Sequence, residues 1–276
     1  MNNEDAAAGA VLEFKGRLSY GDYLHLDELL ESQRPRTDAH DEMLFIIQHQ
    51  TTELWFRLVQ HELDMAMAGI DADELGPAFK ALARVERIFR VLLDAWSVLA
   101  TMTPADYMQF RNSLDAASGF QSHQYRLLEF TLGNKDPLYM RPFEHLPEVS
   151  SRLQTAYHSP SIYDRAIALL ARRGLSIDAD VLGRDVSRPY VPNDSVTAAW
   201  RTVYLDTEHS WDLYELAEKL VDFEEALRQW RFRHVSTVQR IIGAKPGTGG
   251  TAGVQYLRER LNVVLFPELW MVRTDL

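Results

Sequence analysis

Residues 229–250 read QWRFRHVSTVQRIIGAKPGTGG, a stretch that joins an apolar helical stripe to a glycine-rich loop. Apolar positions recur every three or four residues, so on an α-helix they share one face with an imidazole in its middle. The positions of this stripe are Leu227, Trp230, His234, Val238 and Ile241. The spacing predicts a helix that packs with this face inward.

The histidine of the stripe, His234, must place both ring nitrogens, because an unpaired polar group in an apolar interior costs roughly 1–3 kcal/mol. A lone histidine on an apolar face most often bonds a backbone carbonyl, and a metal ion is the alternative partner. Four arginines surround it, at a spacing that suits an anionic group beside the same helix. They are Arg228, Arg231, Arg233 and Arg240.

The loop after this helix begins at Lys245-Pro246-Gly247, where proline and glycine end the helix. Gly247-x-Gly249-x-x-Ala252 resembles a dinucleotide fingerprint only superficially, because that motif follows a strand and a helix precedes it here. Free amides and hydroxyls in the loop suit a small anion such as a carboxylate. A flexible connection is the other interpretation.

Composition sets further limits on function. The chain has 276 residues, 46% of them hydrophobic, and a net charge of −11, which argues against nucleic acid or an anionic membrane as partner. It has no cysteine, which excludes disulfides, thiolate nucleophiles, iron–sulfur clusters and cysteine zinc sites. A signal peptide and a membrane-length apolar run are not found, so we expect a soluble, cytoplasmic protein.

The periodicity elsewhere is helical as well, and no alternating strand pattern of useful length occurs. Residues 1–16 are expected to form a disordered tail, and residues 17–276 a single all-α domain. Helical patterns cover residues 19–30, 41–68, 73–100, a segment from Thr103-Pro104 broken at 118–121, and then 124–132, 159–173, 195–242 and 256–265. Thr103 is predicted to be an N-cap, with Pro104 at the first helical position. Phe266-Pro267-Glu268-Leu269 is predicted to be a helix stop.

A second histidine, His49, follows Phe45 by four residues in a long helical pattern, so the two side chains point the same way. A core histidine and a functional one are both compatible with this spacing. Neither Glu-x-x-His nor His-Glu-x-x-His occurs in the sequence, which excludes the signatures of ferritin-like di-iron bundles and of zinc proteases.

Motifs along nearly the whole chain, from Tyr20 to Arg273, resemble those of the tryptophan 2,3-dioxygenase family, within the haem-dependent aromatic oxygenase superfamily. They are Leu24-x-Leu26-Asp27-x-Leu29-Leu30, residues 41–50 with Glu53-Leu54-Trp55, Tyr107-x-x-Phe110-Arg111, residues 118–122, Leu132-Gly133-Asn134-Lys135, residues 230–234, residues 247–250 and residues 266–269. The resemblance implies long helices around a buried haem b, O2 as co-substrate and a homotetramer.

The resemblance also implies roles for individual residues near the iron. His234 would be the proximal axial ligand of the haem iron, and His49 the catalytic distal histidine that accepts a hydrogen bond from the substrate indole. Phe45 would pack on the indole beside Tyr107.

The amino-acid end of the substrate would be bound, by the same resemblance, by Arg111 and Thr248, with Ser118 and Gly119 lining the haem edge. The short first helix would close the pocket of a neighbouring subunit with Tyr20, Tyr23 and Leu24.

The expected activity is cleavage of the C2–C3 bond of L-tryptophan by O2 to N-formylkynurenine, in tryptophan catabolism by the kynurenine pathway. One alternative is a monooxygenase that converts a substituted tryptophan, such as β-methyltryptophan, to an oxindole in secondary metabolism. Another is a haem-binding protein without catalysis. Departures from the family pattern at His123, usually apolar or aromatic, and at Thr251-Ala252, usually Ser-Ser, leave the substrate open.

Overall fold

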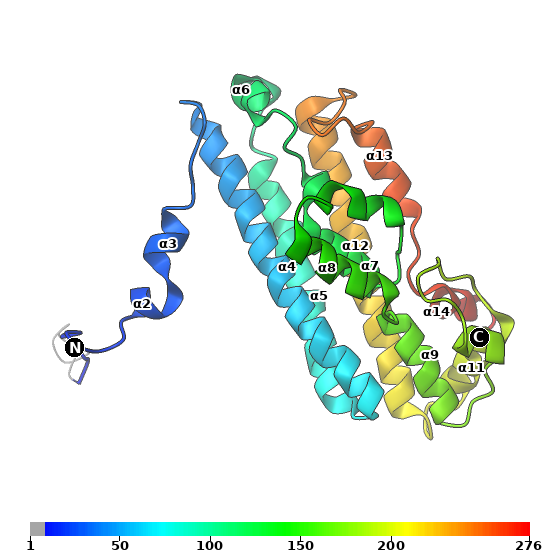
Figure 1. Ribbon diagram of the computed structural model, residues 1–276. Coiled ribbons are helices and arrows are strands. Elements are labelled where there is room, and N and C mark those ends of the chain that lie inside the picture. The colour runs from blue at the N-terminus through cyan, green and yellow to red at the C-terminus, as the bar shows by residue number, and fades with distance from the viewer. Residues whose placement is uncertain (1–8) are drawn as a thin grey trace.

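The computed structural model describes residues 9–276, and every regular element within them is helical (Figure 1). The predicted all-α class is confirmed. The elements are α2 (Tyr20–Leu24), α3 (Leu26–Leu30), α4 (His40–Ala72), α5 (Leu75–Leu99), α6 (Pro104–Phe110), η1 (Arg111–Leu114), η2 (Gly119–Gln121), α7 (His123–Thr131), η3 (Pro137–Phe143), α8 (Pro147–His158), α9 (Ile162–Arg172), α10 (Ala179–Leu182), α11 (Asp194–Leu205), α12 (Trp211–Ile242), α13 (Val254–Glu259), η4 (Arg260–Asn262), α14 (Pro267–Met271) and η5 (Val272–Thr274).

Three long helices form the centre of the fold, with α5 packed along both α4 and α12 (Figure 1). The inward face of α5 is apolar at helical spacing, as Val85, Phe89 and Leu92 are almost fully buried. Burying each such side chain contributes about 1.5–3 kcal/mol. This shared apolar face fixes α4 and α12 on α5, and with them the two histidines.

A buried carboxylate on α12 holds the C-terminal segment against the bundle. Glu224 is fully buried, and it accepts hydrogen bonds from the amides of Leu265 (2.7 Å) and Phe266 (3.1 Å) and from the indole of Trp270 (2.8 Å). A buried carboxylate is tolerated when donors satisfy it in this way. The chain end is therefore part of the domain core.

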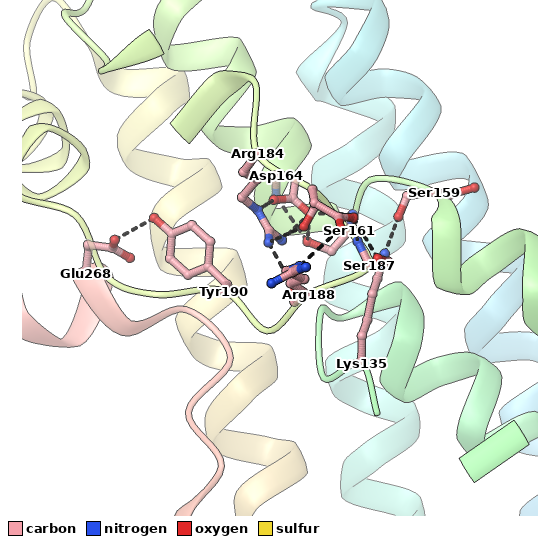
Figure 2. A network of polar contacts seen from close by, with 10 residues as sticks. Lys135, Ser159, Ser161, Asp164, Arg184, Ser187, Arg188, Tyr190 and Glu268 are labelled. Atoms are coloured by element: carbon pink, nitrogen blue, oxygen red, sulfur yellow. Dashed lines mark hydrogen bonds and ion pairs between the residues drawn. The ribbon is translucent and has the colours of Figure 1, made fainter. Parts of the chain in front are cut away.

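A polar network ties the long loop after α9 to the rest of the domain (Figure 2). The Tyr190 hydroxyl donates to Glu268 on α14 at 2.6 Å, and the Arg184 guanidinium pairs with Asp164 at the start of α9 at 2.7 Å. Both contacts join residues distant in sequence, so they fix a loop that has little helix of its own.

Several predicted helix limits need correction. The pattern over residues 19–30 divides into α2 and α3 at His25, whose φ is 51°. Residues 195–242 form two helices, α11 and α12, because residues 206–210 leave the helical conformation. The helix expected from residue 159 begins at Ile162, because Ser161 is its N-cap and forms a capping box with Asp164.

Proline accounts for another error. Pro267 was expected to stop a helix, but it occupies the first turn of α14, where a missing amide donor costs nothing. Pro147 likewise begins α8, which periodicity did not indicate. The prediction that Thr103 caps a helix with Pro104 in its first turn is confirmed, and Asp106 completes the capping box.

The N-terminal segment stands apart from the helical body (Figure 1). Residues 10–14 have no regular structure, and residues 1–8 of the predicted tail lie outside the described residues. On α2, the side chains of Tyr20 and Tyr23 are 74% and 70% exposed, so the described part of the chain leaves most of their surface uncovered.

Between residues 9 and 276, no single helix is long and apolar enough to cross a membrane. Leu75–Leu99 and Pro104–Leu114, bent by 90° relative to each other, meet that criterion together by length and composition only.

Candidate active site

An internal cavity lies between α4, α5, α7 and α12, next to the glycine-rich loop that follows α12. Many of its walls are apolar, with Phe56, Trp96 and Trp230 among the lining side chains. Most residues predicted for a site line this cavity: Phe45, His49, Tyr107, Ser118, Gly119, His234 and Thr248. Residues as far apart in the sequence as Phe45 and Thr248 are therefore brought to one place.

His234 reaches the cavity from α12, on the apolar stripe that its sequence predicts. Its ring stacks on the Trp96 indole, with ring centroids 4.6 Å apart. Burial, and to a smaller extent the nearby His49, lower the pKa of His234 to about 4, so the imidazole is neutral near pH 7. No side chain or carbonyl in the described part of the chain hydrogen-bonds to either ring nitrogen.

His49 enters the same cavity from α4. Its Nδ1 lies 2.6 Å from the carbonyl oxygen of Phe45, one turn earlier. A carbonyl can only accept, so Nδ1 carries the proton and Nε2 is left with a lone pair. Burial lowers the pKa of His49, which favours this neutral form. The adjacent Phe45 ring lies 4.1 Å from the imidazole between centroids and also contacts Tyr107 at 6.1 Å.

The glycine-rich loop is docked on the segment around η2. Thr248 Oγ1 donates to the carbonyl of Ala117 at 2.6 Å. Gly249 lies so close to Ser118 that an added Cβ would be 2.6 Å from the serine Cβ. Glycine is required here by close approach, and the contact places the Thr248 side chain at the cavity.

Arg111 is close to the cavity but not among the residues that line it. Its Nη2 donates to the carbonyl of Pro246 at 2.8 Å, while its Nε is buried without a partner. Burial raises the pKa of Tyr107, and the nearby Arg111 charge opposes this shift. The arginine is therefore positioned at the join between η1 and the glycine-rich loop.

Three predicted residues are not brought to the cavity of their own chain. Tyr20, Tyr23 and Leu24 are exposed on α2, away from the helical body (Figure 1). Their predicted role in a neighbouring subunit stays a prediction.

Other lining residues were missed by sequence reasoning. Trp96 looked like ordinary core, and Arg126 and Arg260 carried no signal, because a single arginine is usually a solvated charge. Among the four arginines near His234, only Arg231 is buried and lines the cavity. Its position one turn before His234 was a usable signal, since the two share a face.

The donor set of the cavity limits the ion it can hold. Over the described residues, no group of three or more His, Asp or Glu side chains is arranged to hold a metal ion. A single histidine with an open cavity beside it suits a metal whose other ligands come from a prosthetic group. Fold and cavity together define an all-helical protein with a cavity lined by two neutral histidines.

Comparison with known proteins gives the family. The profile described as tryptophan 2,3-dioxygenase matches residues 4–276. A protein named tryptophan 2,3-dioxygenase from Polaromonas sp. is 58% identical over 97% of this chain and 91% of its own. Tryptophan 2,3-dioxygenase 1 of Ralstonia nicotianae is 57% identical over the same shares, and a Bradyrhizobium sp. relative 56% identical over 99% and 98%. The chain belongs to the tryptophan 2,3-dioxygenase family.

Proposed function

We propose that this protein uses haem b and O2 to cleave the C2–C3 bond of the indole ring of L-tryptophan, giving N-formylkynurenine. Both atoms of O2 enter the product, so no external reductant is consumed in the overall reaction. The observation that carries the proposal is the placement of two neutral histidines, His49 and His234, in one largely apolar cavity.

The residues present fit a haem. His234 has no protein hydrogen-bond partner in the part of the chain that the structure describes, and its low pKa keeps a ring nitrogen free to ligate iron at neutral pH. The aromatic side chains of Phe45, Trp96 and Trp230 offer flat apolar surface for a porphyrin. When bound, haem would supply a ferrous iron able to bind and activate O2.

His49 orients the substrate in this proposal. Its Nδ1 proton is held by the Phe45 carbonyl, so the Nε2 lone pair accepts a hydrogen bond from the indole N–H. The histidine thereby fixes the direction in which C2 and C3 point, and the Phe45 ring packs against the indole face. Orientation of this kind reduces the entropy cost of the reaction.

Arg111 and Thr248 recognise the amino-acid end. The guanidinium pairs with the substrate carboxylate after it releases the Pro246 carbonyl, and its unpartnered Nε shows that it has a donor to spare. Thr248 offers its hydroxyl oxygen to the ammonium from the loop that is docked on Ala117. Ser118 and Gly119 form the adjoining edge of the haem site.

Exclusion of water depends on the glycine-rich loop and on a second subunit. Tyr20, Tyr23 and Leu24 lie on an arm that extends from the body, which supports a homotetramer in which each arm completes a neighbouring site. From the composition of the chain, we also propose a cytoplasmic location.

The test is mass spectrometry of the product after haem-loaded, reduced protein is given L-tryptophan under isotopically labelled O2. Two labelled oxygen atoms per product molecule are expected. One labelled atom would support the oxindole-forming monooxygenase instead, and no turnover despite a normal haem spectrum would support the non-catalytic protein. Neither alternative is favoured by the relatives, whose names all specify the dioxygenase.

A further inference from the structure

Three arginines from separate parts of the chain line one wall of the cavity. They are Arg126 on α7, Arg231 on α12 and Arg260 on η4. The guanidinium carbons of Arg126 and Arg260 lie 4.1 and 5.4 Å from the centroid of one ring, that of Tyr139. The two side chains therefore converge, and we name the three together the arginine wall.

The arginine wall carries more positive charge than its partners neutralise. Arg126 pairs with Glu129 at 2.5 Å, and Arg231 approaches the same carboxylate at 3.6 Å. Arg260 forms no ion pair with any acidic residue that the structure describes. Guanidinium groups stay protonated at all ordinary pH values, so the three cations outnumber Glu129, their one ion-pair partner among the described residues, and Glu53, the one other carboxylate that lines the cavity.

Hydrogen-bond donors of the wall are also left over. Arg231 is only 4% exposed, yet its Nη2 is buried without a hydrogen bond, because 3.6 Å to Glu129 is too long. The Nε of Arg260 is buried without a partner as well. Buried donors of native proteins normally have acceptors, so these two indicate an acceptor that arrives with a ligand.

We propose that the arginine wall binds the two carboxylate side chains of the porphyrin, and so recognises the prosthetic group by charge as well as through its iron. The inference rests on the proposed function. Two carboxylates would supply acceptors for the two unpartnered donors, on Arg231 and Arg260, whereas an amino-acid substrate brings one carboxylate together with an ammonium. Arg231 precedes His234 by one helical turn, so the wall adjoins the residue that would hold the iron.

The first experiment compares ligands on the wild-type, full-length chain. Metal-free protoporphyrin IX and its dimethyl ester share the ring, but the ester has no carboxylates and neither has iron for His234 to ligate. Fluorescence titration should show the free acid binding about 10- to 100-fold more tightly, as for loss of a hydrogen bond to a charged group. Equal affinities would contradict the proposed role of the arginine wall and leave the proposed function standing. Failure of haem itself to bind would contradict the proposed function.

The second experiment uses variants of one short segment. Arg260→Leu removes a wall charge without leaving an acidic partner unpaired, and should reduce the preference for the free acid at least fivefold, while the ester binds as before. Arg258→Leu is the matched control, because Arg258 is exposed on α13 and hydrogen-bonds Gln239. This variant should prefer the free acid over the ester as strongly as the wild type does. Arg260→Lys should restore part of the preference. If Arg260→Leu weakens both porphyrins equally, the residue is structural and the proposal is wrong.

Discussion

The indole ring of Trp96 lies flat against the imidazole of His234, with the ring planes only 9° from parallel. Trp96 belongs to α5 and His234 to α12, so the contact joins the packing of two central helices to the residue proposed to hold the iron. Because a stacked neighbour opposes rotation of the imidazole, the orientation of His234 is set by the bundle core.

Replacing Trp96 tests the contribution of this contact to stability. Trp96→Ala should lower the free energy of unfolding by about 3–5 kcal/mol, because a buried aromatic side chain is lost and a cavity remains. Trp96→Phe keeps an aromatic face and should cost less. Urea unfolding measures both, with Trp211→Ala as control, since Trp211 is 61% exposed. A loss for Trp211→Ala as large as that for Trp96→Ala would contradict this account.

His234→Ala should abolish stable haem binding, because the Nδ1 of His49, the other histidine of the cavity, is bonded to the Phe45 carbonyl on a different helix. The described residues also contain no cluster of acidic or histidine side chains that could hold a metal ion instead. The measurement is the Soret absorbance of purified protein per chain. His209→Ala is the control, because His209 is exposed and its ring hydrogen-bonds Asp206 outside the cavity. A normal Soret spectrum in the His234 variant would refute its role as axial ligand.

Arg111→Ala should leave haem binding intact and weaken the binding of tryptophan by about 2–5 kcal/mol, as for a charge pair that loses one partner. Titration of the Soret band with L-tryptophan measures the affinity. Arg240→Ala is a close control, because Arg240 also donates to a backbone carbonyl, that of Ala100. Unchanged tryptophan affinity in the Arg111 variant would rule out the carboxylate clamp.

Gly249→Ala should displace the glycine-rich loop, because the new methyl group would meet Ser118 at 2.6 Å. Overpacking of this kind costs about 1–3 kcal/mol, so tryptophan affinity should fall roughly 5- to 100-fold. Gly76→Ala is the control, because nothing lies within 4 Å of a Cβ at that position. If both variants bind tryptophan as the wild type does, the loop does not need its close contact with Ser118.

Lys135 should make the free energy of unfolding depend on pH in the alkaline range. Burial lowers the pKa of its amine to about 8 in the folded chain, where Nζ donates to the Ser159 carbonyl (Figure 2). The unfolded chain keeps the ordinary value near 10.5 and binds more protons between the two, so the free energy of unfolding rises with pH over that window.

The comparison with Lys135→Met isolates this effect, because the tyrosines titrate equally in both proteins. Between about pH 7.5 and 10, the free energy of unfolding in urea should rise by about 1–2 kcal/mol more in the wild type than in the variant. A constant difference across that range would mean that the amine is not held in a less solvated site.

Local periodicity predicted much of the fold. The apolar stripe with His234 on α12, and the shared face of Phe45 and His49 on α4, follow from the 3.6-residue repeat alone. Local chemistry also predicted the capped start of α6. At Pro267 it failed because the outcome depended on a contact with a distant segment: Glu224 holds the chain just before Pro267.

The sequence by itself thus determined that the chain is helical, which faces turn inward, and which family its motifs match. Only the tertiary structure decided that His49 and His234 share a cavity, that Arg111 bonds the Pro246 carbonyl, and that three arginines meet on one wall. The physical reason is separation along the chain. A helical repeat says which way a side chain points, but the packing of α4, α7 and α12 decides what it meets there.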